Sequence, residues 1–244
     1  MEINNNKSHW LSRTELFIGN DGIERLKKAH VLVVGLGGVG SMAAEMLTRA
    51  GIGKLTIVDG DVVNETNINR QMPALVSTLS KSKALVVAER LRDINPNIKL
   101  NIIEEYIKDQ KIIDITAIKY DYVIDAIDTL SPKIYLIFHA FKNNQRIVSS
   151  MGAGGKIDPL QIKVDDLSKS YNCALAFDIR KKLRKLGVTT GVKVVFSSEM
   201  INKKAVVSIE YEQNKKSMVG TISYMPPMFG CYCASVVIRD LIKE

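Results

Sequence analysis

Four glycines follow a short apolar run near the beginning of the chain. Gly35, Gly37 and Gly40 have the spacing G-x-G-x-x-G, and Gly38 lies between them. In this spacing the first glycine permits a tight turn, the second lets backbone approach a phosphate, and the third lets the next helix pack on the strand. The free N–H groups at the start of that helix attract anions. We therefore predict that a mononucleotide or dinucleotide binds here; the alternative is a turn that serves packing alone.

Acidic, amide and basic side chains follow the glycines at positions that suit a nucleotide. Asp59 comes 19 residues after Gly40 and ends the next apolar run, where an acid commonly binds ribose hydroxyls. The loop DGDVVNETNINRQ then supplies Asn67 and Arg70, and Lys83 opens the next helical segment. Arginine binds phosphate oxygens bidentately, whereas lysine binds them as a point charge. This set predicts a terminal triphosphate rather than a nicotinamide cofactor.

Two carboxylates, Asp125 and Asp128, belong to the stretch VIDAID. Carboxylates at the carboxyl end of a parallel strand face the ligand crevice, and Asp128 is placed to bind Mg²⁺ on the phosphates. Asp125 has a second interpretation, in which it caps or orients the helix that begins near Ser131. Any one of these charges could be a solvated surface group, so the prediction depends on their joint arrangement.

Short apolar runs alternate with helical patterns between residues 30 and 151. The predicted strands are 31–34, 55–58, 100–103, 122–127 and 147–148. The predicted helices are 41–50, 81–95 and 131–143, the second with Ala84, Leu85, Ala88 and Leu91 on one face. This order predicts an α/β fold, a Rossmann-like and mostly parallel sheet with helices on both faces.

The alternation changes after Met151. LQIKVDDL, VKVVFSSE and AVVSIEYE are predicted strands in a partly antiparallel arrangement, ALAFDIRKKLRKLG is a helix ending at Gly187, and CYCASVVIRDLIK is a final helix. Residues 200–225 are too generic to assign. We predict a single domain over 1–244, with a nucleotide-binding core at about 12–151 and an extension on the substrate side at about 152–244.

The net charge of +8 is concentrated in the last third of the chain. Residues 151–244 contain 15 Lys and Arg but only 9 Asp and Glu. A basic surface suits a polyanion such as RNA, but it is also a common solvated face. The candidate RNA-binding residues lie on the basic helix: Arg180, Lys181, Lys182, Arg184 and Lys185. Tyr171 and Phe177 could stack bases, although we expect them to pack in the core.

Three cysteines, Cys173, Cys231 and Cys233, include no C-x-x-C pair and cannot form a disulfide framework. We expect core or surface thiols, keep a redox or persulfide role open, and expect no structural zinc. A reducing cytoplasm is the default compartment. Residues 1–10 are polar and the sequence contains no apolar stretch of membrane-spanning length, so we expect no signal peptide and no membrane partner.

Four stretches of the sequence resemble the ThiF-type adenylating family, which is related to ubiquitin-activating enzymes. They are SRTELFIGNDGIERLKKAHVLVVGLGGVGSMAAEMLTRAGIG, DVVNETNINRQMPAL, VIDAIDT and SSMGAGGKIDP. Within this family the chain resembles the branch of bacterial tRNA threonylcarbamoyladenosine dehydratases, of which LRKLGVTTGVKVVFSSE is a feature. The resemblance covers residues 12–198, and MPPMFGCYCASVVIRDLI resembles the closing segment of the family less closely.

The resemblance implies an ATP–Mg²⁺-dependent enzyme that joins a carboxylate to AMP and releases pyrophosphate. In this branch the carboxylate belongs to threonylcarbamoyladenosine in the anticodon loop of tRNA. The neighbouring carbamoyl group then closes on the acyl adenylate, AMP leaves, and the net change is loss of water. The resemblance also implies a homodimer and leaves room for a sulfur-relay partner, either a cysteine desulfurase or its acceptor.

The resemblance also implies residue roles. Gly38 would lie against the nucleotide, Asp59 would bind ribose, and Asp128 would bind magnesium. Arg13 matches an arginine that relatives extend across a dimer into the partner's site. The residues expected to hold the phosphates are Asn67, Arg70 and Lys83.

Three other functions stay open at this point. The first is an adenylating activator of the C-terminus of a ubiquitin-like sulfur-carrier protein, whose relatives often bind zinc through two C-x-x-C pairs. The second is a nicotinamide-dependent oxidoreductase, and the third is a binding module without catalysis. The absence of C-x-x-C pairs, the basic last third and the subgroup segment favour the dehydratase.

Overall fold

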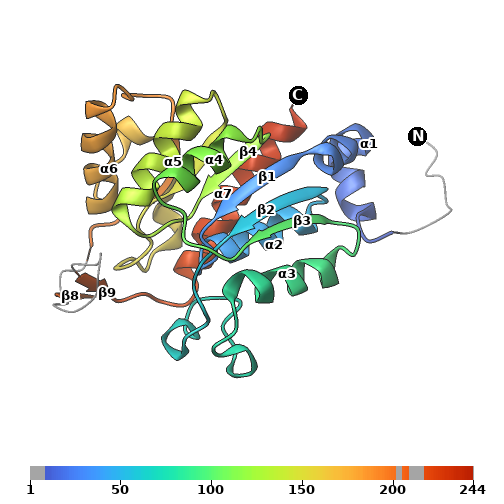
Figure 1. Cartoon of the computed structure of the whole chain (residues 1–244), viewed down its shortest axis with the longest axis horizontal. Coiled ribbons are helices and arrows are strands. Elements are labelled where there is room, and N and C mark those ends of the chain that lie inside the picture. Colours follow the sequence, from blue (N-terminus) through green and yellow to red (C-terminus); the bar gives the residue numbers. More distant parts are fainter. Residues whose placement is uncertain (1–8, 202–204, 209–216, 244) are drawn as a thin grey trace.

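The structure is a computed structural model that describes residues 9–201, 205–208 and 217–243. Seven strands form one sheet in the order β3-β2-β1-β4-β5-β7-β6 (Figure 1). Neighbouring strands are parallel except β6 and β7. The strands are β1 (His30–Val34), β2 (Lys54–Val58), β3 (Lys99–Ile103), β4 (Tyr122–Asp125), β5 (Ile147–Ser150), β6 (Ile162–Asp166) and β7 (Lys193–Ser197). β8 (Val206–Ser208) and β9 (Ser217–Val219) form a separate antiparallel pair.

Helices cover both faces of the sheet, because successive residues of its central strand point to opposite faces. Val31 and Val33 of β1 belong to one apolar cluster, and Leu32 and Val34 belong to the other. The first cluster includes residues of α1 (Ser12–Lys28), α2 (Gly40–Arg49), α3 (Lys83–Ile94) and α7 (Met225–Ile242). The second includes residues of α4 (Gln110–Ala117), α5 (Leu130–Lys142) and α6 (Ala174–Lys185). Figure 1 shows α4 and α5 on one side of the sheet and α7 on the other.

Short 3₁₀ helices lie in the connections. They are η1 (Glu65–Asn67), η2 (Val76–Thr78), η3 (Pro159–Gln161) and η4 (Leu167–Lys169). Among the described residues, no helix has both the length and the apolar character needed to cross a membrane.

The predicted α/β class and partly antiparallel extension are confirmed. The division at residue 151 stays a prediction, although β7 and β6 continue the same sheet. α1 and α4 were not predicted, β4 ends at Asp125 rather than at 127, and α7 begins at Met225 rather than at 231. Leu85 is 42% exposed instead of buried, since Val87 faces the core in its place. The predicted strand AVVSIEYE contains β8, and its residues 209–212 lie outside the described residues.

Candidate active site

The glycine turn lies at the carboxyl end of β1, where the strand order reverses between β1 and β4. Gly35 N–H donates to Val58 O at 2.8 Å, and Ala126 N–H donates to Val34 O at 2.8 Å. Gly35 has φ +85°, and a Cβ there would lie 2.7 Å from Ala126 O. A Cβ at Gly40 would overlap Gly35 O. These two positions therefore require glycine for the turn itself, between the ends of β2 and β4.

Gly37 and Gly38 differ in their surroundings. A Cβ at Gly38 would lie 2.7 Å from Cβ of Pro226 and 2.8 Å from Arg70 O, so this glycine allows α7 and the Arg70 loop to approach the turn. A Cβ at Gly37 would meet nothing closer than the Gln71 amide nitrogen, at 3.6 Å. Gly37 is therefore the position where the turn is open enough for a ligand to approach the backbone.

Asp59 binds the glycine turn directly. Its Oδ2 accepts from Leu36 N–H at 2.6 Å, and its Oδ1 accepts from Asp61 N–H at 2.8 Å. Burial raises the pKa of Asp59, while the hydrogen bonds from these two N–H groups oppose that shift. The carboxylate thus stands beside the turn at the end of β2, and ribose binding stays a prediction.

Lys83 lies in the same region, but it already has a carboxylate partner. Its side chain is buried, and its Nζ lies 2.8 Å from Oδ2 of Asp61. Tyr106 donates its hydroxyl hydrogen bond to Oδ1 of the same aspartate. Neither contact was predicted from the sequence, although Asp61 lies only two residues after Asp59.

The loop that carries Asn67 and Arg70 folds back over the glycine turn. Asn67 is buried, and its Oδ1 accepts from Asn64 N–H at 3.1 Å, which closes the first turn of η1. Arg70 donates from Nη1 to Thr66 O and to Asn69 Oδ1, each at 2.8 Å. These bonds fix the loop from within, so Asn67 is positioned as a structural residue as well as a candidate ligand.

Gln71 is a further residue beside the glycine turn that was not predicted from the sequence. Its Oε1 is buried and has no hydrogen-bond partner among the described residues, and its Nε2 lies beside Gly37. A buried amide without a partner is unfavourable. Its position directly after Arg70 is the feature of the sequence that could have identified it.

Asp125 and Asp128 lie in different environments. Asp125 is fully buried, and its Oδ2 lies 2.8 Å from Nζ of Lys133 in α5 and accepts from the Ser149 hydroxyl at 2.5 Å. This confirms the interpretation that Asp125 orients the helix, and it excludes the view that its carboxylate faces the crevice. Asp128 is exposed and lies within electrostatic range of the Tyr106 hydroxyl, on the side of Asp59 and Asp61.

Arg13 does not reach the glycine turn of its own chain. It is exposed at the start of α1, two residues after Leu11, which packs against Gly51 beyond the end of α2. Since α2 begins at the turn and spans ten residues, its length separates the two places by about 15 Å. A role for Arg13 in the nucleotide site of another copy stays a prediction.

The five basic residues of α6 are not equivalent. Lys181, Lys182, Arg184 and Lys185 are exposed, as the RNA prediction requires. Arg180 is half-buried and donates from Nη1 to Ser170 O and Ser170 Oγ, each at 2.7 Å. Tyr171 and Phe177 are 45% and 56% exposed, so the expected core packing of these rings is wrong.

The cysteines do not gather. Cys231 and Cys233 lie two residues apart on α7, where side chains do not face each other. Cys233 is fully buried and Cys231 is partly exposed, while Cys173 is buried at the start of α6. Within the part of the chain that the structure describes, no three His, Cys, Asp or Glu side chains are grouped to hold a metal ion.

A glycine turn at the switch point of a doubly wound sheet, with an acid and cations beside it, defines a nucleotide-binding α/β protein. A sequence model of the ThiF family matches residues 11–244, and the chain belongs to that family. This confirms the resemblance drawn from the four sequence stretches.

Several relatives that are similar over most of this chain share one name. The tRNA threonylcarbamoyladenosine dehydratase of Bacillus subtilis is 38% identical over 243 residues, which cover 97% of this chain and 96% of that protein. The Escherichia coli enzyme of the same name is 41% identical over 195 residues, covering 77% and 73%. The crystal structure of the E. coli enzyme in complex with ATP has a TM-score of 0.89 and 34% identity, and it covers 100% of this chain and 98% of that chain.

Proposed function

We propose that this chain is an ATP-dependent tRNA threonylcarbamoyladenosine dehydratase. The substrate carboxylate attacks the α-phosphorus of ATP, pyrophosphate leaves, and the carbamoyl group of the same nucleoside displaces AMP to close a five-membered ring. Because the ring closure is intramolecular, positioning supplies much of its rate and no protein nucleophile is needed. The names of the relatives support the substrate, and the ATP complex of the E. coli enzyme supports the nucleotide.

One observation carries the proposal: the glycine turn, Asp59 and the Arg70 loop meet at one crevice. Asp59 accepts from Leu36 N–H of the turn at 2.6 Å, and a Cβ at Gly38 would lie 2.8 Å from Arg70 O. The ten-residue helix α2 begins at the glycine turn, and the N-terminus of a helix attracts anions. The site therefore offers backbone donors and cations to a polyphosphate and a carboxylate to a ribose.

The cations offset the repulsion between two anionic reactants. Arg70 and Lys83 would bind the triphosphate and stabilise the departing pyrophosphate. The exposed carboxylate of Asp128 fits a divalent cation shared with phosphate oxygens. When bound, Mg²⁺ would supply charge neutralisation on those oxygens.

The proposal includes a homodimer, in which Arg13 of each chain serves the partner's crevice. The packing of Leu11, two residues before Arg13, at the opposite end of α2 from the glycine turn supports this arrangement. The exposed lysines and Arg184 of α6 would contact tRNA phosphates without reading sequence. A sulfur-relay partner and a cytoplasmic location stay predictions.

The test is ATP turnover to AMP and pyrophosphate, with and without tRNA that carries threonylcarbamoyladenosine. Mass spectrometry of the digested nucleosides follows the base in the same tubes. We expect ATP-dependent loss of one water from the nucleoside, abolished by Asp128→Ala and retained by Asp93→Ala, which removes an exposed aspartate near the far end of α3. ATP cleavage with unchanged RNA would indicate a carrier-protein substrate, and no ATP cleavage would overturn the proposed activity.

A further inference from the structure

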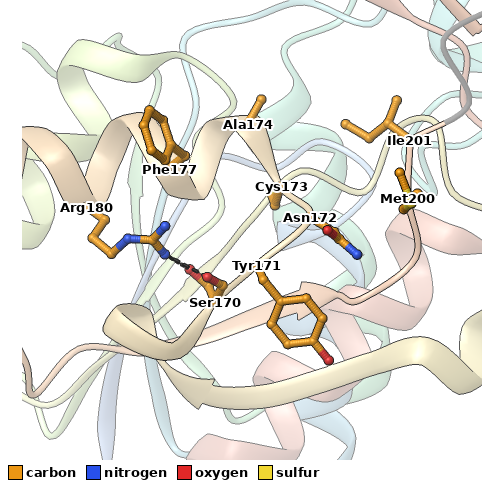
Figure 2. Close-up of a pocket in the computed structure, with 9 residues that line it drawn as sticks. All are labelled: Ser170, Tyr171, Asn172, Cys173, Ala174, Phe177, Arg180, Met200 and Ile201. Atoms are coloured by element: carbon orange, nitrogen blue, oxygen red, sulfur yellow. Dashed lines mark hydrogen bonds between the residues drawn. The ribbon is translucent and has the colours of Figure 1, made fainter.

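A pocket of about 430 Å³ opens beside the start of α6, away from the glycine turn. Figure 2 shows Phe177 and Arg180 on one side of it and Met200 and Ile201 on the other, with Tyr171 and Cys173 between. Its volume lies in the range of small-molecule binding pockets. Tyr171, Phe177 and Met200 are 45%, 56% and 77% exposed, so apolar surface is presented to solvent here.

The wall of the pocket is held in place by hydrogen bonds. Arg180 binds the carbonyl and hydroxyl of Ser170 at 2.7 Å, and Lys156 Nζ binds Asn172 O at 3.1 Å. Asn172 has φ +53° and donates from Nδ2 to Ser198 O at 2.7 Å. The segment between Ser170 and Cys173 is therefore preformed, which lowers the entropic cost of binding.

The aromatic rings are also fixed. Tyr171 accepts from Lys163 Nζ at 2.6 Å and packs edge-on against Phe196, with ring centroids 5.5 Å apart. The guanidinium of Arg180 lies 5.9 Å from the centroid of the Phe177 ring. Exposed aromatic rings bind planar ligands by stacking.

The exposed surface of α6 continues from the pocket as a basic stripe. Phe177 and Lys181 are four residues apart on the helix, and Arg184 and Lys185 follow one turn later, so all four share one face. The helix as a whole carries five Lys and Arg and one Asp. An aromatic pocket in line with cations is complementary to a nucleobase and its phosphate backbone.

The pocket is separate from the glycine turn. Its Cys173 lies against Gly152, where a Cβ would be 3.8 Å from Sγ, and Gly152 follows β5. β4 and β5 thus separate the pocket from the glycine turn. A ligand that reacts at the crevice cannot place its reacting group in this pocket, but another part of the same RNA can lie there.

We propose that this pocket receives an unstacked nucleobase of the tRNA anticodon loop, at a position other than threonylcarbamoyladenosine itself. The base stacks on Phe177, and the flanking phosphates contact Lys181 and the basic residues beyond it. This inference depends on the proposed function, because it takes its occupant from the tRNA substrate.

The experiment uses the full-length protein and a short anticodon stem-loop RNA that contains threonylcarbamoyladenosine. Phe177→Ala should raise the Kd for this RNA by roughly 10- to 100-fold, with no change in the slope of log Kd against log salt. Phe177→Tyr keeps a stacking ring and should bind nearly as the wild type does. Lys181→Gln should reduce the salt slope by about one. Tyr135→Ala, which removes an exposed aromatic ring of α5, is the matched control.

A second readout locates the base. 2-Aminopurine placed at each loop position in turn should be quenched by wild-type protein at one position and not by Phe177→Ala. Thermal unfolding checks that the variant is folded, as we expect for a half-exposed side chain.

The outcomes separate the two proposals. If the wild-type enzyme is active but Phe177→Ala has an unchanged Kd and unchanged quenching, the proposed base-binding role of the pocket is wrong while the proposed function stands. Weaker RNA binding with normal water loss at saturating RNA would support it. Failure of the wild-type enzyme to remove water from any tRNA would overturn the proposed function, and the RNA occupant with it.

Discussion

Lys83 Nζ lies 2.8 Å from Oδ2 of Asp61, and the lysine side chain is 6% exposed whereas the aspartate is 43% exposed. A cation expected to bind phosphate is therefore held against a carboxylate at the rim of the crevice. Tyr106 donates to the same carboxylate. Binding of a triphosphate would replace part of this pairing, so the two residues should respond differently to substitution.

Lys83→Met should lower the rate of pyrophosphate release about 10²- to 10³-fold, as loss of one preorganised donor does. Asp61→Asn keeps the cation but removes its counter-charge, and it should lower the free energy of unfolding by about 1–2 kcal/mol, since solvent screens the exposed aspartate. Pyrophosphate assays and urea unfolding measure the two effects. Lys81→Met, at the exposed neighbouring lysine, is the control. Normal turnover in Lys83→Met would exclude a phosphate role for that residue.

The buried pair of Lys133 and Asp125 should matter mainly for stability. Lys133 Nζ lies 2.8 Å from Asp125 and also donates to Ile127 O at 2.9 Å, one residue before Asp128. Lys133→Met leaves a buried carboxylate unpaired and should cost about 3–5 kcal/mol of unfolding free energy in urea. The double variant Lys133→Met with Asp125→Leu should recover part of that loss. A single variant within 0.5 kcal/mol of wild type, on the scale of ordinary surface changes, would argue that the pair is not formed.

Substitutions at Gly37 and Gly38 should affect different properties, ATP binding at Gly37 and stability at Gly38. Gly38→Ala places a Cβ 2.7 Å from Pro226 and 2.8 Å from Arg70 O, and such overpacking costs about 1–3 kcal/mol. Gly37→Ala meets only the Gln71 amide, at 3.6 Å, so it should change stability little while raising the Kd for ATP about tenfold or more. Thermal unfolding measures the stability of both variants, and calorimetric titration measures their Kd for ATP. The reverse pattern would show that the nucleotide does not approach Gly37.

The contribution of Glu45 to the free energy of unfolding should depend on pH. Burial alone would raise its pKa, but hydrogen bonds from Arg90 and Arg49 outweigh burial and lower the pKa below its ordinary value. A lowered folded-state pKa contributes stability that is present above the unfolded value of about 4.3 and is lost as pH falls through the folded value. Glu45→Gln should therefore cost about 1 kcal/mol at pH 7, because the arginines are half exposed, and progressively less in acid. Urea unfolding of the wild type and Glu45→Gln between pH 7 and acid tests this prediction. A difference in unfolding free energy that does not change with pH would indicate a packing effect instead.

The cysteine pair of α7 should be unreactive in the native protein. Burial raises the pKa of Cys233 to about 12 and also raises the pKa of Cys231. At pH 8 the thiolate fraction of Cys233 is then about 10⁻⁴, so iodoacetamide should label it about 10³-fold more slowly than in the unfolded chain. Peptide mass spectrometry measures this rate. Rapid labelling of native Cys233 would restore a redox or persulfide role as a candidate.

The sequence by itself determined the class of the fold and the location of the nucleotide crevice. Continuous apolar runs, which are typical of buried parallel strands, and the spacing of Gly35, Gly37 and Gly40 are local patterns that the order of residues specifies directly. For the same reason the acid after the second strand, Asp59, could be placed beside the turn before any contact was known. The helices α1 and α4 were not predicted, because α1 is interrupted at Gly19, where φ is +74°, and α4 has only eight residues.

Tertiary structure decided which side chains have partners. Asp61 joins Lys83 across 22 residues, and Lys133 neutralises Asp125 beneath the loop that carries Asp128. The long connections of a doubly wound sheet create such pairs, and no local pattern specifies them. The same holds for exposure: the ring of Phe177 faces solvent because Ala176, Ile179 and Leu183 supply the buried face of α6. Likewise, the packing of Leu11 against Gly51 places the start of α1 at the opposite end of α2 from the glycine turn, which no local pattern around Arg13 specifies.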